Sequence, residues 1–263
     1  MKIIDTHAHL DQLEDLEGSL QRAIDAGVAA IVVPSMDLKS CRRNLELAAQ
    51  IKSPKIYIGL GMHPSEVNLN ELEEVLALIR LHHDKISAVG EIGLDFWYKG
   101  VAKDENKKNE QRTAFRAFLE IAKEFDLPAI IHSRGAWKDC LSIAQDVGVK
   151  RAEFHWYSGP IDILDEILSA GYYVSTSPSV AYSPQSRAAM AHAPIERALI
   201  ETDCPVYYRN KDTDEGFQAE PKDILRTLKA YADLKGIGPD AALRQLNGNA
   251  VRFFDLNPLL VEG

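Results

Sequence analysis

The chain has 263 residues, of which 46% are apolar and 26% charged, and its formal net charge is −9. Such a chain can bury a large core, as one barrel or as two smaller domains. Its negative charge argues against a broad basic surface that grips nucleic acid non-specifically, although bound divalent ions would supply local positive charge for such a substrate.

Cysteine content and hydropathy indicate the cellular compartment of the protein. Cys41, Cys140 and Cys204 are widely spaced and form no C-x-x-C pattern, so we expect no disulfide framework. The N-terminus lacks a signal-like segment, and no apolar run approaches the roughly 20 residues of a membrane span. We therefore expect a cytoplasmic protein with no membrane partner and no obligate protein partner, and a monomer by default.

Short apolar runs rich in β-formers alternate with amphipathic helical segments along the chain. The expected strands are 2–6, 29–33, 56–60, 86–91, 128–132, 151–155, 172–175 and 197–201, and the expected helices are 15–26, 38–51, 70–82, 107–125, 136–147, 161–170, 184–192 and 220–235. This alternation favours parallel β/α units. Eight pairs predict an α/β fold, a single closed (β/α)8 TIM barrel, and the absence of a linker predicts one domain over residues 1–263.

Three further segments lie outside this pattern. A last helix at 239–247, which begins at Pro239, is expected outside the barrel. The loops 98–108 and 207–220 are long and polar, and both follow strands, so we expect them at the C-terminal mouth where barrel active sites lie. They are either solvated loops or a substrate contact or lid.

Potential metal ligands stand at the ends of several expected strands. His7 and His9 are two residues apart on the first strand, so their side chains share a face, and paired imidazoles suit a divalent metal. The other four residues follow the fourth, fifth, sixth and eighth strands, and they are Glu91, His132, His155 and Asp203. Because the strand ends of a barrel meet at one rim, all six side chains can share a pocket.

The number of these residues exceeds what one ion needs. Four imidazoles and two carboxylates suit two ions that share a bridging carboxylate. Each residue taken alone has a structural alternative: a hydrogen-bonded core histidine, a partner of a buried arginine for Glu91, or a turn or N-cap for Asp203. Their joint placement at one rim favours a dinuclear metal site at the C-terminal ends of the strands.

Several ordered motifs carry a family resemblance over nearly the whole chain. They are Asp5-Thr6-His7-Ala8-His9-Leu10, Gly61-Met62-His63-Pro64, Gly90-Glu91-Ile92-Gly93-Leu94-Asp95, Ile131-His132-Ser133-Arg134, His155-Trp156-Tyr157-Ser158-Gly159, Glu201-Thr202-Asp203-Cys204-Pro205 and Asn249-Ala250-Val251-Arg252-Phe253-Phe254. The chain resembles the TatD family of metal-dependent hydrolases, within the amidohydrolase-like TIM-barrel superfamily. Tyr157 and Cys204 depart from the family's usual Phe and Ala, and Trp156 is bulky at a variable position, which leaves the substrate open.

The resemblance implies a division of the ligands. Glu91 would bridge the two ions, His7, His9 and Asp203 would bind one of them, and His132 and His155 would bind the other. The ions themselves would be Zn²⁺, Mg²⁺ or Mn²⁺. Two such ions would lower the pKa of a water between them and generate hydroxide at neutral pH. Asp203 would orient this hydroxide and take its proton.

Other residues are candidates for substrate contacts. His63 resembles the family's pocket histidine and would bind a phosphate or assist the leaving group, or else it packs the loop before Pro64. Arg134 would hold a phosphate or carboxylate, or pair with a neighbouring carboxylate. Asp95 would orient a metal-site histidine or hold the loop that begins at Phe96, whose aromatic run 96–98 would stack on a base or pack the barrel rim.

The leading hypothesis is a metal-dependent hydrolase with exodeoxyribonuclease-like action on DNA ends or on another small phosphodiester. The hydrolase part follows from the ligand set, and the DNase part follows only from the resemblance. An amide, ester or lactone hydrolase would use the same site. A metal-binding accessory protein without turnover is the non-enzymatic alternative, and the intact candidate base Asp203 argues against it.

Overall fold

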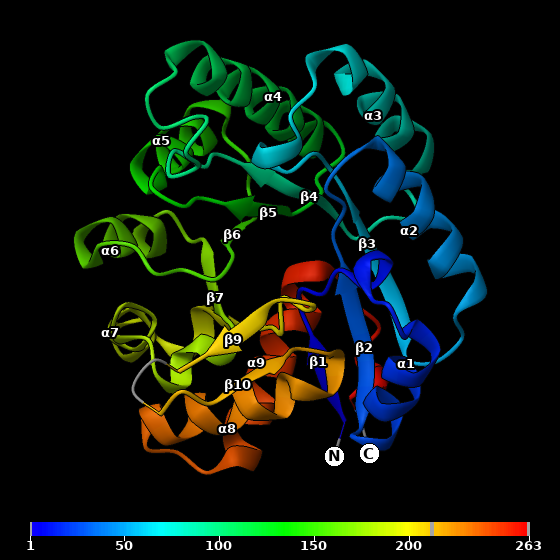
Figure 1. Cartoon of the computed structure of the whole chain (residues 1–263), viewed down its shortest axis with the longest axis vertical. Coiled ribbons are helices and arrows are strands. Elements are labelled where there is room, and N and C mark those ends of the chain that lie inside the picture. The colour runs from blue at the N-terminus through cyan, green and yellow to red at the C-terminus, as the bar shows by residue number, and fades with distance from the viewer. Residues whose placement is uncertain (1, 211–212, 262–263) are drawn as a thin grey trace.

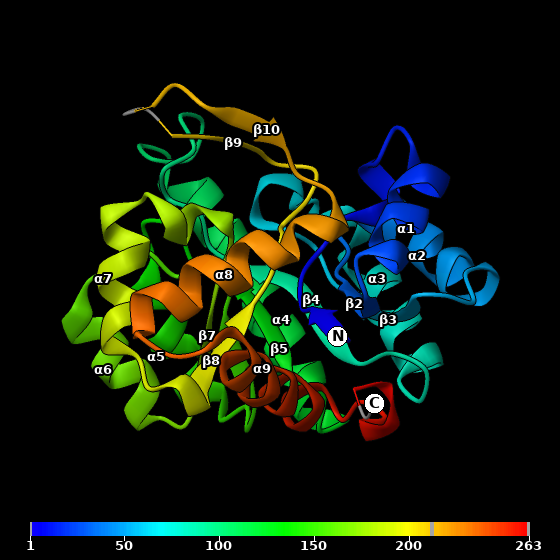
Figure 2. The ribbon, with the colours of Figure 1, turned by 90° about the horizontal axis from the view of Figure 1, so that it is seen from below.

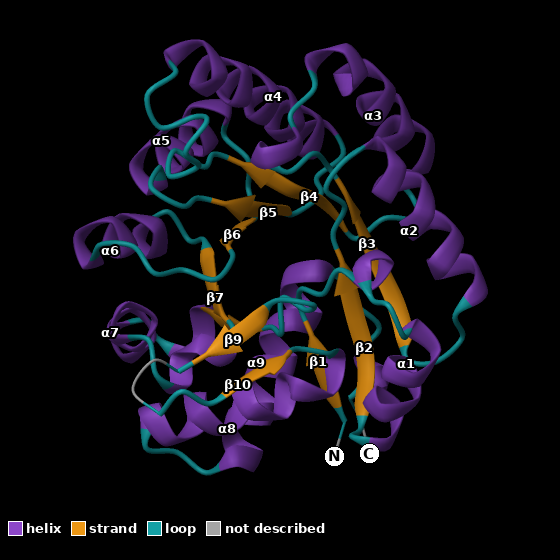
Figure 3. Ribbon diagram, viewed as in Figure 1, coloured by secondary structure: helices purple, strands orange, loops and turns teal. Residues whose placement is uncertain are grey.

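The structure, a computed structural model, describes residues 2–210 and 213–261, and it confirms the predicted (β/α)8 barrel (Figure 1). Each strand pairs in parallel with the next one along the chain, and the ring of strands lies inside the helices (Figure 3). The strands are β1 (Ile3–Asp5), β2 (Val28–Val33), β3 (Lys55–Leu60), β4 (Ala88–Gly93), β5 (Ala129–His132), β6 (Ala152–Phe154), β7 (Tyr173–Thr176) and β8 (Ala198–Ile200).

Helices connect successive strands and cover the outside of the barrel. They are α1 (Leu16–Asp25), α2 (Leu38–Gln50), α3 (Leu69–His82), α4 (Glu105–Glu124), α5 (Trp137–Val147), α6 (Ile161–Ser169), α7 (Pro184–His192) and α8 (Ile224–Lys235). Several begin at a residue whose side chain accepts hydrogen bonds from the first turn, as Asp15, Asp37 and Asp104 do. Over residues 2–210 and 213–261, no helix has the length and apolar character needed to cross a membrane.

Backbone hydrogen bonds join the two edges of the barrel beyond the end of β1. The N–H of Thr6 donates to Ile200 O at 3.2 Å, the N–H of Asp203 to His7 O at 2.9 Å, and the N–H of His9 to Cys204 O at 2.8 Å. The predicted strand 2–6 therefore ends earlier, at Asp5. His7 and His9 lie in an extended segment held against the chain that follows β8.

The last helix differs from the prediction of 239–247. Helix α9 (Pro239–Phe254) continues for two more turns, and it lies across the N-terminal end of the barrel (Figure 2). Asn247 Nδ2 donates to Lys2 O at 2.8 Å, and Asn249 Nδ2 donates to Ala198 O at 2.8 Å. The aromatic rings of Phe253 and Phe254 in α9 pack against apolar side chains of the strands. These side chains are Ile4, Ala30, Val32, Ala88, Ile130 and Leu199.

The two polar loops lie at the opposite, C-terminal end. Most of the segment 207–220 is a two-stranded hairpin, β9 (Tyr207–Arg209) and β10 (Gly216–Gln218), which stands above the barrel in Figure 2. Residues 211–212 of this segment lie outside the described residues. The loop 98–108 is shorter than expected, because the side chain of Asp104 caps α4 and the helix begins at Glu105.

Candidate metal centre

The six predicted ligands come together at the C-terminal mouth, and four of their atoms form a first donor set. His7 Nε2 and His9 Nε2 are 3.2 Å apart. Glu91 Oε2 lies 3.3 Å from the former and 3.4 Å from the latter. Asp203 Oδ1 lies 3.6 Å and 3.5 Å from the same two nitrogens. All four residues are buried.

The second oxygen of Glu91 belongs to a second donor set. Glu91 Oε1 lies 2.8 Å from His155 Nε2 and 3.0 Å from His132 Nδ1, and these two nitrogens are 3.3 Å apart. Each oxygen of Glu91 therefore faces a different group of nitrogens. This is the arrangement that a bridging carboxylate needs.

The spacing of the donor atoms tests whether divalent ions fit. Donors at about 2.1 Å from one ion are separated by about 3.0 Å in an octahedron and by about 3.4 Å in a tetrahedron. The measured separations, from 2.8 to 3.6 Å, fall around these values in both sets. His7 Nδ1 and His9 Nδ1 have no hydrogen-bond partner within the described chain, so their Nε2 atoms are the ones turned to the centre. The residues fit two divalent ions.

Carboxylates behind the second set select which nitrogen each ring presents. Asp95 Oδ2 binds His132 Nε2 at 2.8 Å and leaves Nδ1 for the centre. Glu201 Oε1 lies 3.4 Å from His155 Nδ1 and leaves Nε2, and its other oxygen accepts from the Ser175 hydroxyl at 2.5 Å. The Asp95 contact matches the expectation that it orients a histidine. The motifs did not predict that Glu201 contacts a histidine of the centre. Its position two residues before Asp203, which places both at the same strand end, was a signal that could have indicated it.

Unusual backbone conformations occur beside these side chains. Gly93 has φ +143°, and a Cβ there would lie 1.9 Å from His132 O, so only glycine allows β4 and β5 to approach at this point. Asp203 (φ +48°) and Trp156 (φ +41°) are in the left-handed region, which is an outlier for a bulky residue such as Trp156. Such strained positions cluster at functional sites.

The charges of the centre are strongly coupled. Burial alone would raise the pKa of Glu91, but the charge of His155 and a hydrogen bond with His132 hold it well below its usual range. Burial alone would lower the pKa of His9, yet hydrogen bonds to Asp203 and Glu91 raise it to about 10. Without an ion, the centre therefore pairs ionised carboxylates with protonated imidazole, and an ion would displace the proton.

His63 lies at the second donor set, and its ring also holds the loop that follows it. It precedes the short 3₁₀ turn η2 (Pro64–Glu66), and its Nδ1 accepts from the N–H of Ser65 at 3.0 Å. Its Nε2 is 3.2 Å from His132 Nδ1 and 3.5 Å from Glu91 Oε1. Because a backbone N–H can only donate, a neutral His63 carries its proton on Nε2. Burial lowers the pKa of His63 to about 3, which favours this neutral form.

Arg134 pairs with a neighbouring carboxylate, which is one of the two roles considered for it. Its Nε donates to Asp95 Oδ2 at 2.8 Å, and its guanidinium lies over the ring of Tyr98, 4.8 Å from the centroid. The side chain is 45% exposed, and its Nη atoms make no hydrogen bond within residues 2–210 and 213–261. Its outer N–H groups are therefore available at the mouth.

Gln111 of α4 was singled out by no motif, but it joins two loops of the centre. Its Nε2 donates to Pro64 O at 2.9 Å, and its Oε1 accepts from the N–H of Asp95 at 3.0 Å. This buried amide therefore fixes the segments that carry His63 and Asp95. A glutamine inside an amphipathic helix gives no local signal of such a contact.

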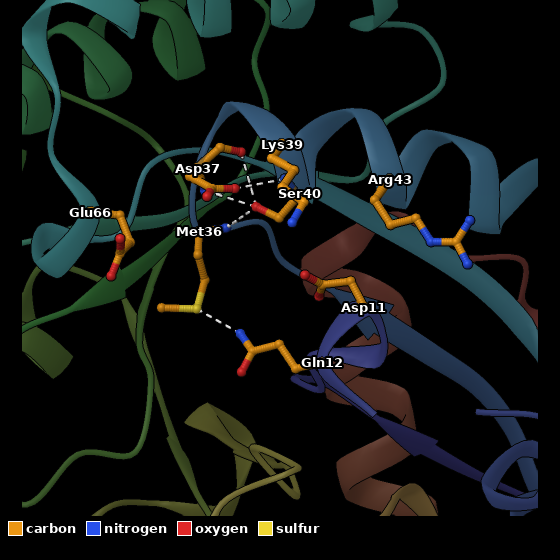
Figure 4. A pocket seen from close by; sticks show the side chains of 8 residues that line it. All are labelled: Asp11, Gln12, Met36, Asp37, Lys39, Ser40, Arg43 and Glu66. Carbon is orange, nitrogen blue, oxygen red and sulfur yellow. Dashed lines mark hydrogen bonds between the residues drawn. The ribbon is translucent and has the colours of Figure 1, made fainter. Parts of the chain in front are cut away.

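A cavity of about 420 Å³ hollows the mouth on the β1–β3 side (Figure 4). Residues of three segments line it: the turn η1 (Leu10–Gln12) after His9, the start of α2, and η2 after His63. One of the dashed contacts in Figure 4 joins Gln12 Nε2 to Met36 Sδ, at 2.8 Å. The lining mixes acidic and basic groups, and its residues are Asp11, Gln12, Met36, Asp37, Lys39, Ser40, Arg43 and Glu66.

Comparisons with known proteins agree with this geometry. The profile of a family described as TatD related DNase matches residues 4–255. The chain is 30% identical to the uncharacterized metal-dependent hydrolase YabD of Bacillus subtilis, over 97% of this chain and 100% of that protein. It is 27% identical to the human deoxyribonuclease TATDN3, over 96% and 94% of the two chains. The crystal structure of YjjV, a TatD homologue from Escherichia coli K12, superposes with a TM-score of 0.87 at 28% identity, over 97% of this chain and 98% of that one.

Proposed function

Because this chain belongs to the family of TatD-related DNases and is a metal-dependent hydrolase, we propose that it cleaves phosphodiester bonds of DNA, beginning at strand ends. The observation that carries the proposal is Glu91, whose two oxygens face two separate sets of imidazole nitrogens. DNA as the substrate is supported by the name of the human relative. The net charge of −9 favours short or end-bound substrates over extended duplex.

In this proposal His7, His9 and Asp203 would hold one divalent ion, His132 and His155 would hold a second, and Glu91 would serve both sets. The imidazoles of the donor sets suit Zn²⁺, whereas the carboxylates also suit Mg²⁺ and Mn²⁺. When bound, two such ions polarise the phosphoryl oxygen under attack and lower the pKa of a water between them.

Asp203 is the proposed proton acceptor. Burial would raise the pKa of this carboxyl, but its contacts with His9 and His7 lower it, so the group is ionised at neutral pH. An ionised carboxylate at the mouth can orient the attacking water, take its proton and pass it to the leaving oxygen.

Two other side chains contact the substrate in this mechanism. Arg134, fixed through its Nε by Asp95, directs its free Nη groups at a non-bridging phosphate oxygen. His63 presents Nε2–H to an oxygen of the same phosphate or of the leaving group. A neutral imidazole held in this way stabilises negative charge by hydrogen bonding and does not deliver a proton as an acid.

The test is a substrate panel. Protein stripped of metal and reloaded with Mg²⁺, Mn²⁺ or Zn²⁺ is given 3′- or 5′-labelled single-stranded oligonucleotides, beside carboxylic esters, lactones and amides. We expect metal-dependent, stepwise shortening from one end. Turnover of a lactone or amide without any shortening of the oligonucleotides would replace the proposal by the corresponding amidohydrolase activity.

The substitution Asp203→Asn tests whether Asp203 is the general base. Asparagine tolerates the left-handed φ of this position, so the backbone need not change. We expect kcat to fall about 10²–10⁴-fold, as for loss of a general base. The matched control is Asp126→Asn, because Asp126 also has a positive φ (+54°) but lies exposed between α4 and β5. Full activity of Asp203→Asn on the best substrate would refute the assigned role.

A further inference from the structure

The segment that joins β4 to α4 carries an exposed group of cations beside an exposed indole. We call residues 96–108 the β4–α4 rim. Lys99, Lys103 and Lys107 are exposed and form no ion pair within the described residues. The acidic neighbours are engaged elsewhere: Asp104 caps α4, and Glu105 pairs with Lys108 and Arg112. The rim is therefore a local positive surface on a chain of net charge −9.

The Trp97 side chain is exposed yet held in place. It is 65% exposed. Its ring lies against Gly135, where a Cβ would come within 2.2 Å of Trp97 Cδ1, and it meets Trp137 edge-on at 5.8 Å. The backbone N–H of Trp97 donates to Asp95 Oδ1 at 2.9 Å. One side of the indole is thus supported while much of its surface remains free to stack.

The rim is continuous with the candidate metal centre. Asp95, which binds the backbone of Trp97, also binds His132 at 2.8 Å. The ring of Tyr98 is 6.4 Å from that of His63 and lies under the guanidinium of Arg134. Aromatic and cationic groups therefore connect the second donor set to the segment of chain that carries the lysines.

We propose that the β4–α4 rim binds the single strand that leads away from the scissile phosphodiester. Trp97 stacks on a base of that strand, and Lys99, Lys103 and Lys107 neutralise its phosphates. The inference rests on the proposed function for the reaction, but it concerns a separate binding surface. Single-strand binding combines these two features, a stacking platform and a cationic track along the backbone.

The chemistry of the rim favours a single strand over other occupants. A free indole stacks on an unpaired base, whereas the bases of a duplex are already stacked on each other. A protein partner is disfavoured because lysine is depleted in protein–protein interfaces. The acidic remainder of the chain would repel the long backbone of a duplex.

Direct binding tests this surface. Dissociation constants of the metal-loaded protein for a twelve-nucleotide phosphorothioate oligothymidylate are measured by quenching of tryptophan fluorescence at several salt concentrations. We expect Trp97→Ala to weaken binding by about 5- to 100-fold and to remove much of the quenching. The triple variant K99E/K103E/K107E should weaken binding and reduce the slope of log K against log salt by about 2.

The matched control is K52E/K55E/K85E, which reverses three exposed lysines at the opposite end of the barrel. It should keep the dissociation constant within about twofold at moderate salt, where distant charges are screened. Unchanged binding in both rim variants, equal loss in the far-end control, or equally tight binding of a duplex would overturn the proposal.

A second readout separates this inference from the proposed function. Bis(4-nitrophenyl) phosphate is a phosphodiester without the strand that the rim is proposed to bind, so the rim variants should hydrolyse it with unchanged kcat/KM. If the wild-type protein cleaves neither this compound nor oligonucleotides, the proposed function fails. The binding measurements still decide whether the rim holds a single strand.

Discussion

Asp5 accepts two hydrogen bonds from Thr202, one from its backbone N–H at 2.9 Å and one from its hydroxyl at 2.6 Å. Asp5 ends β1, and Thr202 precedes Asp203, so this buried pair joins the segments that carry the first donor set. Because Asp5 and Thr202 are 197 residues apart in sequence, the pair also joins the two edges at which the barrel closes. It therefore links the stability of the fold to the geometry of the centre.

The pH dependence of stability reports on this pair. Burial raises the pKa of Asp5 from 3.8 to about 8, so the folded state keeps a proton that the unfolded chain loses. The contribution of this proton to the free energy of unfolding is full below pH 4. It falls as pH rises to about 8, by up to about 1.4 kcal/mol per pH unit. We expect Asp5→Asn to fold and to lose this slope. Urea unfolding of the metal-free proteins from pH 5 to 8 measures it, and parallel curves for wild type and variant would contradict the assignment.

Metal uptake should release protons. The pKa of His9 is raised to about 10 in the metal-free centre, and a ligand imidazole must be neutral, so each binding event at this set displaces at least one proton below pH 10. Apparent affinity should then rise with pH, by up to tenfold per unit for each proton. Calorimetry in buffers of different ionisation enthalpy counts the protons. His83→Ala, at an exposed histidine, should release the same number, and heats that do not depend on the buffer would refute this expectation.

The tautomer of His63 is directly measurable. Two-bond ¹H–¹⁵N spectra should show its proton on Nε2, because Ser65 donates to Nδ1. We expect His63→Ala to lower kcat/KM about 10- to 100-fold, as for loss of a hydrogen bond to a charged group, and His63→Gln to recover part of this loss. Both variants should keep the metal content of the wild type. Loss of an ion in either one would instead make His63 a ligand.

Arg134 should act on substrate binding. Arg134→Lys keeps the charge but loses the planar fork, so we expect KM for an oligonucleotide to rise about tenfold with a smaller change in kcat. Arg134→Ala should raise KM further. Metal content, measured alongside, should not change in either variant. Arg116→Lys on the exposed face of α4 serves as the control. An unchanged KM in both Arg134 variants would limit this residue to holding Asp95.

Periodicity and motif spacing were sufficient for the barrel and for the convergence of the ligands, because both depend on local patterns. The apolar runs that predict strands are the ones that line the barrel. The residues that follow those runs meet at one rim by topology alone. Glu91 and His132 could therefore be placed together without knowing any contact between them.

Features that depend on distant partners could not be predicted in this way. Asn247-Gly248-Asn249 has the composition of a helix end, yet α9 continues because Asn247 and Asn249 bind backbone groups of the distant segments that begin β1 and β8. The direction of the His63 ring depends on a cap two residues away, and the role of Gln111 on two loops that it joins. Such contacts leave no periodic pattern in the sequence.

The hydrogen bond from Asn247 to Lys2 O, next to the first strand, has a consequence for the order in which the barrel folds. Residues are added from the N-terminus, so β1 is synthesised before β8 and α9, the elements that contact it. His7 and His9 are synthesised long before Asp203 and Cys204, whose backbone groups hold them in place. The first donor set can therefore form only after Asp203 has been synthesised and the seam between β1 and β8 has closed.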